Sequence, residues 1–335
     1  MHATLLKSLA AAGLAAVLAH PAQAADYTMR LSHVFPPQHP LGKAATAYAE
    51  AVKAETGGRV AVEILGAGQA FAERESYPAV AKGQIEATLL VSVQFSGIVP
   101  TLDVLSIPFV MRGDDSANKF LASAARAKLD EEIRARRVEP LAWLFQTNTT
   151  VFTSNAKPLV AIDDFAGIKI RGLNKVADAS LVAVKASPLA TPGSEVYQAL
   201  QSGVLDAALT DVSAALARRY YEVQKYGTVV DNWVTAYGVL LANRAWVEKL
   251  PKDVREGLKR AAATAEKGAI AAGAANVKGA ISGLKEKGMS LTILSDSQEE
   301  AWAKAMTAPS KAAYLERTGD AGKAVLSAFD GLDAR

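Results

Sequence analysis

Alternation between strand-like and helix-like segments near the start of the chain constrains its fold more than any other feature. Apolar residues recur with period two in residues 27–35, 60–65 and 85–93, as in strands. Residues 40–58 carry small and apolar residues at helical spacing and end in two glycines, and a shorter helix containing Pro78 follows. The β-α-β-α-β order predicts a parallel or mixed sheet covered by helices.

The rest of the chain continues this mixed pattern. With 335 residues, the chain is long enough for two domains or one large α/β unit. Residues 139–155 read as two strand-like pieces, between which the chain is expected to change lobe. Further strands are expected at residues 167–172, 204–212, 235–243 and 289–294, and helices at 174–186, 194–203, 245–288 and, as a terminal pair, 297–319.

One internal similarity suggests two lobes of related topology. The segment KGQIEATLL, residues 82–90, resembles SGVLDAALT, residues 202–210. Each reads as the end of a helix, a glycine, an apolar residue, an acid-alanine pair and a strand. Because ligands of open α/β sheets bind beyond the carboxyl ends of strands, both strand ends are expected at a shared cleft. Chance similarity between two helix–strand junctions is the alternative.

The N-terminal segment has the pattern of a secretory signal peptide. Residues 1–24 contain Lys7, an apolar run too short to span a bilayer, and an Ala-x-Ala end. We expect cleavage after Ala24 and export to the periplasm; an amphipathic core helix is the alternative. The chain has no cysteine, so disulfides and thiol chemistry are excluded.

The composition disfavours several classes of function. The 37 Lys and Arg residues nearly balance the 34 Asp and Glu residues, which argues against nucleic acid as a partner. Beyond the predicted leader only His33 and His39 remain, with no further metal ligands near them in the sequence. Without cysteine and with so few histidines, a catalytic triad is not expected. A carboxylate-based hydrolase remains open.

The stretch DDFAGIKIRG, residues 163–172, raises a specific question. Ile168 and Ile170 alternate with Lys169 and Arg171, so the apolar pair is expected on one sheet face and the cationic pair on the other. Arg171 stands at the carboxyl end of this short strand. Locally, the simplest interpretation is a solvated charge on an exposed edge, since most arginines are exposed.

Residues 27 to about 320 resemble the solute-binding proteins of tripartite ATP-independent periplasmic (TRAP) transporters, the DctP-like family. Several ordered blocks carry the resemblance: YPAVAKGQIEATL, VLSIPFVMR, TSNAKPLVAIDDFAGIKIRG, ASPLATPGSEVYQALQSGVLDAALTD, RRYYEVQKYGTVVDNW and ANRAWVEKLPKDVREGLKRAA. The third contains the D-hydrophobic-x-G-h-K-h-R pattern that ends at Arg171.

This resemblance implies an α/β, two-lobed periplasmic binding protein (type II-like) with a cleft between the lobes and a long Ala-rich helix region. The lobes are expected to comprise residues 25–149 plus about 236–275, and 150–235 plus about 276–335. Lobe closure would capture a small organic carboxylate, expected to be a monocarboxylate, with hydroxy, oxo or ring-bearing acids open. A permease with small and large membrane subunits would receive it. No metal, cofactor or catalytic residue is implied, and a monomer is expected.

The family pattern also assigns candidate ligand-binding residues. Arg171 matches the arginine that clamps the ligand carboxylate, and its planar fork suits a carboxylate. Asn174 matches a ligand-contacting asparagine. Thr210 replaces an asparagine of many members, and Thr150 stands where sialic-acid-binding members carry a second arginine. Gly193 stands where members often place an aromatic ring over the ligand.

Five further residues lie in segments expected to line the cleft: Phe35, Gln94, Phe145, Trp233 and Tyr237. Ordinary packing is the alternative for each. If Trp233 or Tyr237 faces the cleft, it could replace the missing aromatic cover and favour a ring-bearing acid. Two other functions share the expected fold: a ligand sensor for a membrane receptor and a component of ATP-driven uptake.

Overall fold

The computed structural model describes residues 25–112, 115–330 and 332. The predicted signal peptide, residues 1–24, lies outside this part of the chain. Within it, no helix combines the length and the hydropathy that a membrane crossing needs.

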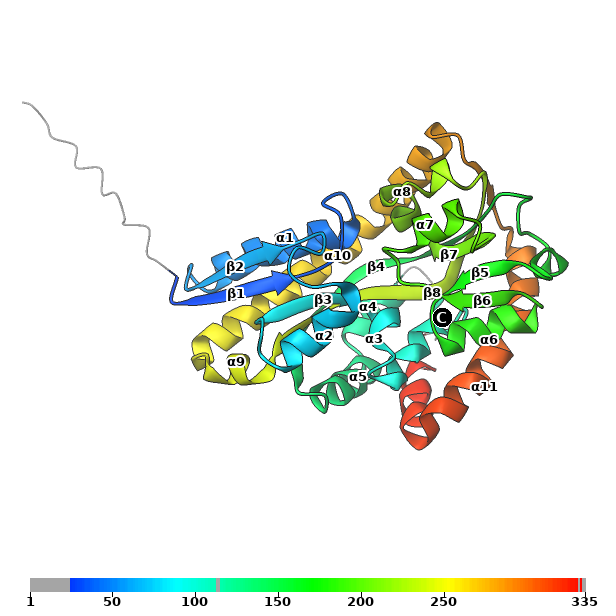
Figure 1. Ribbon diagram of the computed structural model, residues 1–335. Coiled ribbons are helices and arrows are strands. Elements are labelled where there is room, and N and C mark those ends of the chain that lie inside the picture. Colours follow the sequence, from blue (N-terminus) through cyan, green and yellow to red (C-terminus); the bar gives the residue numbers. More distant parts are fainter. Residues whose placement is uncertain (1–24, 113–114, 331, 333–335) are drawn as a thin grey trace, which may run out of the picture.

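A single nine-stranded sheet runs through the molecule in the order β2-β1-β3-β8-β4-β7-β5-β6, with β9 beside β8 (Figure 1). Strand β1 is parallel to β2 and β3, whereas β8 is antiparallel to β3, so the sheet is mixed as predicted. The strands are β1 (Tyr27–Ser32), β2 (Val60–Leu65), β3 (Ala87–Val91), β4 (Val138–Ser154), β5 (Lys169–Gly172), β6 (Ser187–Ala190), β7 (Ala207–Asp211), β8 (Tyr226–Asn243) and β9 (Ser290–Ile293).

Two long antiparallel strands, β4 and β8, connect two lobes. Residues 238–242 of β8 pair with β3 in the first lobe, and residues 150–154 of β4 pair with β7 in the second. The β4–β8 register shifts on both sides of Thr147. The sequence suggested two strand pieces here, but β4 is one continuous strand; bulges interrupt its alternation without ending its pairing.

Helices cover both lobes, and two of them are long. Helix α10 packs against α1, β4 and α8, so it extends along both lobes (Figure 1). Helix α11 bends at Gly319 (φ 56°) and continues to Phe329, so residues 297–318 form one helix rather than the expected terminal pair. The helices are α1 (Pro40–Glu55), α2 (Glu73–Ala81), α3 (Ser92–Phe95), α4 (Ser116–Leu121), α5 (Ala124–Arg134), α6 (Lys175–Ala183), α7 (Val196–Gln201), α8 (Val212–Ala217), α9 (Arg244–Lys249), α10 (Lys252–Glu286) and α11 (Asp296–Phe329), with 3₁₀ turns η1 (Pro100–Ser106), η2 (Ile162–Phe165) and η3 (Tyr220–Glu222).

The internal similarity corresponds to equivalent structure. Helix α2 ends before Gly83 (φ 73°) and β3 follows; helix α7 ends before Gly203 (φ 74°) and β7 follows. The positive φ explains why both junctions contain glycine. Each strand then leads directly into a short helix, α3 or α8. The two lobes therefore present equivalent strand ends, as predicted.

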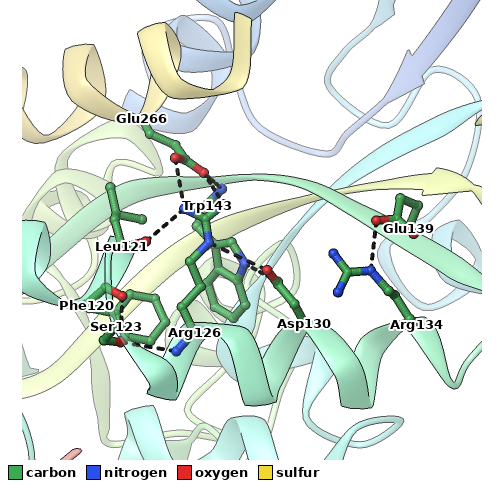
Figure 2. A network of polar contacts seen from close by, with 9 residues as sticks. All are labelled: Phe120, Leu121, Ser123, Arg126, Asp130, Arg134, Glu139, Trp143 and Glu266. Atoms are coloured by element: carbon green, nitrogen blue, oxygen red, sulfur yellow. Dashed lines mark hydrogen bonds and ion pairs between the residues drawn. The ribbon is translucent and has the colours of Figure 1, made fainter. Parts of the chain in front are cut away.

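A buried polar network joins α5, β4 and α10 (Figure 2). Glu266 of α10, which is 5% exposed, accepts two hydrogen bonds from the Arg126 guanidinium (2.8 and 3.0 Å) and one from the Trp143 backbone N–H (2.8 Å). The Trp143 indole N–H donates to Asp130 (2.8 Å), which also lies 3.6 Å from Arg126. These contacts fix the long helix onto the first lobe.

Candidate functional site

Two adjoining cavities lie at the paired strand ends. The outer cavity, of about 400 Å³, is lined by α2, β3, α3, η1, β5, the start of α6, residues 190–192 and α11. The inner cavity, of about 50 Å³, lies deeper, against β4, β7, α8 and the turn before α1. Val93, Gln94, Arg171 and Leu173 line both. Arg171 thus stands where the two spaces meet.

Arg171 is buried, which overturns the interpretation of a solvated edge charge. Its side chain follows the buried Ile170 on β5, and the residue is only 5% exposed. Nε donates to the carbonyl oxygen of Thr191 (3.1 Å) and Nη1 donates to that of Leu209 (2.8 Å). Two backbone carbonyls therefore hold the guanidinium in place, and Nη2 remains available to a ligand.

Within the part of the chain that the structure describes, the charge on Arg171 has no ion-pair partner. Burial lowers the pKa of Arg171, although an arginine stays protonated in proteins. A buried cation is costly unless an anion compensates it. The arrangement therefore suits an anionic ligand.

Four other predicted residues line the cavities. Thr150 and Thr210 are buried on the paired strands β4 and β7, with hydroxyl groups able to donate or accept. Phe35 stacks against His39 with ring centroids 4.8 Å apart. Gln94, on α3, has a buried side-chain oxygen without a hydrogen-bond partner among the described residues. The inner cavity brings all four close to Arg171.

Asn174 lines the outer cavity but already uses its polar atoms. Its Oδ1 caps α6 by accepting from the N–H groups of Val176 and Ala177 (3.2 and 3.0 Å). Its Nδ2 donates to Ser106 Oγ (2.8 Å) and lies 3.4 Å from the Val93 carbonyl oxygen. Asn174 therefore bridges the two lobes, and its contact with a ligand remains a prediction.

Three predicted residues are not brought to the cavities. Trp233 and Tyr237 are fully buried in the core: the Trp233 indole packs edge-on against Phe152 (5.1 Å), and the Tyr237 ring packs against Phe120 (4.9 Å). Phe145 packs against Tyr237 and the α10 helix instead of the cleft. Large rings gain most from complete burial. Neither Trp233 nor Tyr237 can therefore replace the missing aromatic cover over the ligand.

Sequence reasoning missed several polar groups at the cavities. Arg218 lines the inner cavity beside Arg171, and Gly193 packs directly against its guanidinium. Asp211 lines the same space, and burial raises the pKa of its carboxyl. The sequence offered one signal for Arg218, namely the glycine at position 193 where family members often have an aromatic residue. That signal does not indicate which distant side chain occupies the space beside Gly193.

Two further titratable groups come from the first lobe. Glu73, at the start of α2, has both carboxylate oxygens buried without a hydrogen-bond partner among the described residues. Burial raises the pKa of Glu73, while Arg218 and Arg171 oppose this shift. His39 caps α1 by accepting from the Leu41 N–H (3.2 Å), and burial lowers its pKa to about 3, so this imidazole is neutral.

Asp178 provides a pH-dependent prediction at the outer cavity. Burial raises the pKa of its carboxyl to about 6, although it accepts from the Leu173 N–H (3.0 Å). Its folded pKa exceeds its unfolded value, so its stabilising contribution is full below about pH 4 and is lost as pH rises through 6. Relative to Asp178→Asn, we expect the wild-type free energy of unfolding to fall by about 2 kcal/mol across that range. Denaturant titrations at each pH measure this; a pH-independent difference would contradict it.

The fold and the cavities together define a class of protein. Two lobes joined by strands β4 and β8 enclose a buried cation, Arg171, that has no ion pair among the described residues and lies at the paired strand ends. This is the arrangement of a two-lobed solute-binding protein.

Comparisons with known proteins identify the family. Residues 31–317 match bacterial extracellular solute-binding protein, family 7. The C4-dicarboxylate-binding periplasmic protein DctP of Rhodobacter capsulatus is 30% identical over 312 residues, 92% of each chain. The chain belongs to this DctP family of TRAP solute-binding proteins, which are transport components and not enzymes.

Solved structures of similar proteins support the same family. A TRAP periplasmic solute-binding protein from Desulfovibrio salexigens with bound orotic acid has a TM-score of 0.86 and 26% identity, covering 91% of this chain and 98% of that one. Another from Sulfurospirillum deleyianum with bound succinate has a TM-score of 0.81 and 27% identity, covering 91% and 99%. The predicted two-lobed α/β fold is confirmed.

Proposed function

We propose that this protein binds a small organic acid with one carboxylate on Arg171. The observation that carries the proposal is the buried Arg171 guanidinium, which two backbone carbonyls hold, which has no ion pair among the described residues and which faces a cavity of about 400 Å³. Nη2 and the remaining Nη1 hydrogen can donate to a carboxylate as charge-assisted hydrogen bonds. Orotic acid and succinate in the related structures belong to the same chemical class.

Capture would occur by closure of the lobes. Strands β4 and β8 join the lobes and shift register near Thr147, so this segment can act as the hinge. The ligand contacts Arg171 from the second lobe and α3 from the first, so binding favours the closed state. The Asn174–Ser106 hydrogen bond also joins the two lobes beside the outer cavity.

The transport role follows from the family. We infer that the closed protein delivers its ligand to the small and large membrane subunits of a TRAP permease. Cleavage after Ala24 would release the protein into the periplasm, consistent with the leader-like pattern of residues 1–24. Delivery to a membrane receptor is the alternative with the same fold, and uptake of the ligand in a permease-deficient strain separates the two.

A thermal-melt screen tests the ligand class. Each organic acid is compared with its amide, which has a similar shape but no charge. At about a thousand times its dissociation constant, a true ligand should stabilise the protein by roughly 4 kcal/mol, a shift of several degrees. The acid is expected to stabilise and the amide is not. Equal stabilisation by both would contradict a carboxylate site.

A further inference from the structure

Glu73 brings a buried carboxyl group from the first lobe to the ligand cavity. It is the first residue of α2 and lines the outer cavity together with Arg171 of the second lobe. Both carboxylate oxygens of Glu73 are buried, and neither has a hydrogen-bond partner among the described residues. None of the ion pairs in the described chain includes Glu73. Because a buried polar group without partners is costly, this carboxyl needs an explanation.

Opposing influences act on the charge of this carboxyl. Burial favours its neutral form and raises the pKa of Glu73, and the nearby Glu195 adds to this shift. Arg218 and Arg171 of the second lobe and Arg74 of the same helix favour the ionised form. The N-terminus of a helix also favours a negative charge. The arrival of one more charge can therefore decide whether Glu73 carries a proton.

The walls of the two cavities contain more acids than solvent-shielded cations. None of the four acids among the described lining residues is exposed, whereas two of the five lining cations, Arg74 and Lys175, are exposed. The acids are Glu73, Asp103, Asp178 and Asp211, and the shielded cations are Arg171, Arg218 and Arg317. A bound carboxylate adds one more negative charge to this set. One acid is therefore expected to become neutral when an anion binds.

The other three acids have partners that favour their ionised forms. Asp211 accepts two hydrogen bonds, of 2.6 and 2.8 Å, and Asp178 accepts one from a backbone N–H (3.0 Å). Asp103 forms an ion pair in which Oδ2 lies 3.2 Å from Arg317 Nε. Hydrogen bonds and opposite charges stabilise an ionised carboxyl. Glu73 has neither kind of partner among the described residues, so it is the acid that most readily takes a proton.

A neutral Glu73 would offer the ligand a hydrogen-bond donor. A protonated carboxyl has one O–H donor, whereas an ionised carboxyl only accepts. Arg171 donates from the second lobe, so the O–H of Glu73 would hold the same anion from the first lobe. Two carboxylates that share a site raise the pKa of one of them. One proton between them replaces their repulsion by a hydrogen bond.

We propose that Glu73 is a ligand-binding residue that contacts the bound anion as a neutral carboxyl, so that one proton enters the cavity with each organic-acid anion. This inference rests on the proposed function and adds a contact from the first lobe. The anion and the proton together leave the net charge of the cavity unchanged. Affinity should fall between the pKa of Glu73 in the empty protein and its higher pKa in the complex, by up to about 10-fold for each pH unit.

Calorimetry with lactate, pyruvate and orotate tests the inference between about pH 6 and 8, where the carboxylates of these probes stay ionised. The best acid of the thermal-melt screen is used if none of the three binds. Each titration is repeated in buffers with different heats of ionisation, because the difference in heat gives the number of protons taken up. The wild-type protein should take up close to one proton and bind about 10-fold or more weakly at pH 8 than at pH 6.

Glu73→Gln keeps a neutral donor at the same place. It should take up no proton, hold a constant affinity and bind about 10-fold or more tightly than the wild-type protein at pH 8. Glu75→Gln is the matched control on the same helix, since Glu75 is exposed and accepts from the Ala72 N–H (3.3 Å). It should keep the wild-type proton uptake and pH dependence. Melting temperatures of both variants identify any loss caused by unfolding.

Three results would overturn the inference. If organic acids bind without proton uptake and with an affinity independent of pH, the inference fails while the proposed function stands. If uptake persists in Glu73→Gln and is lost in Asp178→Asn, the second acid of the outer cavity takes the proton instead. If no organic acid binds the wild-type protein, the inference and the proposed function both fail.

Discussion

Replacing Arg171 by glutamine is expected to abolish organic-acid binding while leaving the protein folded. The variant removes the buried charge that the carboxylate would neutralise, and truncating one partner of a buried charge pair costs about 2–5 kcal/mol or more. This corresponds to roughly a 30- to 5,000-fold increase in Kd. Calorimetry with the acid identified by thermal melts measures the change.

The unliganded Arg171 variant should remain stable. Because Arg171 has no ion pair within the described chain, its replacement breaks no ion pair, although the Thr191 and Leu209 carbonyls lose a donor. Lys169→Gln is the matched control on the same strand, since Lys169 is exposed and lies 3.7 Å from Asp206. Retained affinity in Arg171→Gln would show that the carboxylate binds elsewhere. Arg171→Lys should also bind weakly, because it keeps charge without the planar fork.

Replacing Glu266 by alanine is expected to cause the largest loss of stability. The change leaves the Arg126 guanidinium and the Trp143 N–H without their shared acceptor in a buried network (Figure 2). Breaking a buried pair by removing one partner costs about 3–5 kcal/mol. The melting temperature should fall by roughly 10 °C for a chain of this length.

An exposed ion pair provides the control for Glu266. Glu139 accepts from Arg134 (2.9 Å), but the two side chains are 24% and 42% exposed. Glu139→Gln should therefore change the free energy of unfolding by only about 0–1 kcal/mol. Glu266→Gln retains an acceptor for the Trp143 N–H. Its loss in free energy of unfolding should therefore lie between those of Glu266→Ala and Glu139→Gln. Similar stabilities for Glu266→Ala and Glu139→Gln would refute a stabilising role for the buried network.

Local sequence patterns predicted most of the elements because strands and helices leave periodicities of two and 3.6 residues. The β-α-β-α-β start and the two glycine junctions at Gly83 and Gly203 were predicted in this way, since a positive φ restricts the residue type. The family pattern also selected Arg171. The strand and helix patterns and the glycine junctions depend on a few neighbouring residues, whereas Arg171 was selected by the resemblance to the family.

Long-range packing decided the rest. Alternation placed Lys169 and Arg171 on the same strand face, yet Lys169 is exposed and Arg171 is buried. Distant segments cause this difference, because the loop at Thr191 and the carbonyl group of Leu209 cover the face at Arg171. Trp233 and Tyr237 were expected at the cleft, yet the core buries their rings. Burial depends on which segments meet, and strand periodicity does not specify the partner.

The second arginine of the cavity illustrates this division most clearly. The sequence showed a glycine at position 193 where family members often have a ring, and two consecutive arginines at 218 and 219. Only the tertiary structure brings the Arg218 guanidinium into the space beside Gly193 and leaves Arg219 exposed. Local sequence patterns determine the elements, and the resemblance to the family singles out Arg171. Arg218 comes to lie beside Gly193 only through the packing of the loop after β6 against the end of α8.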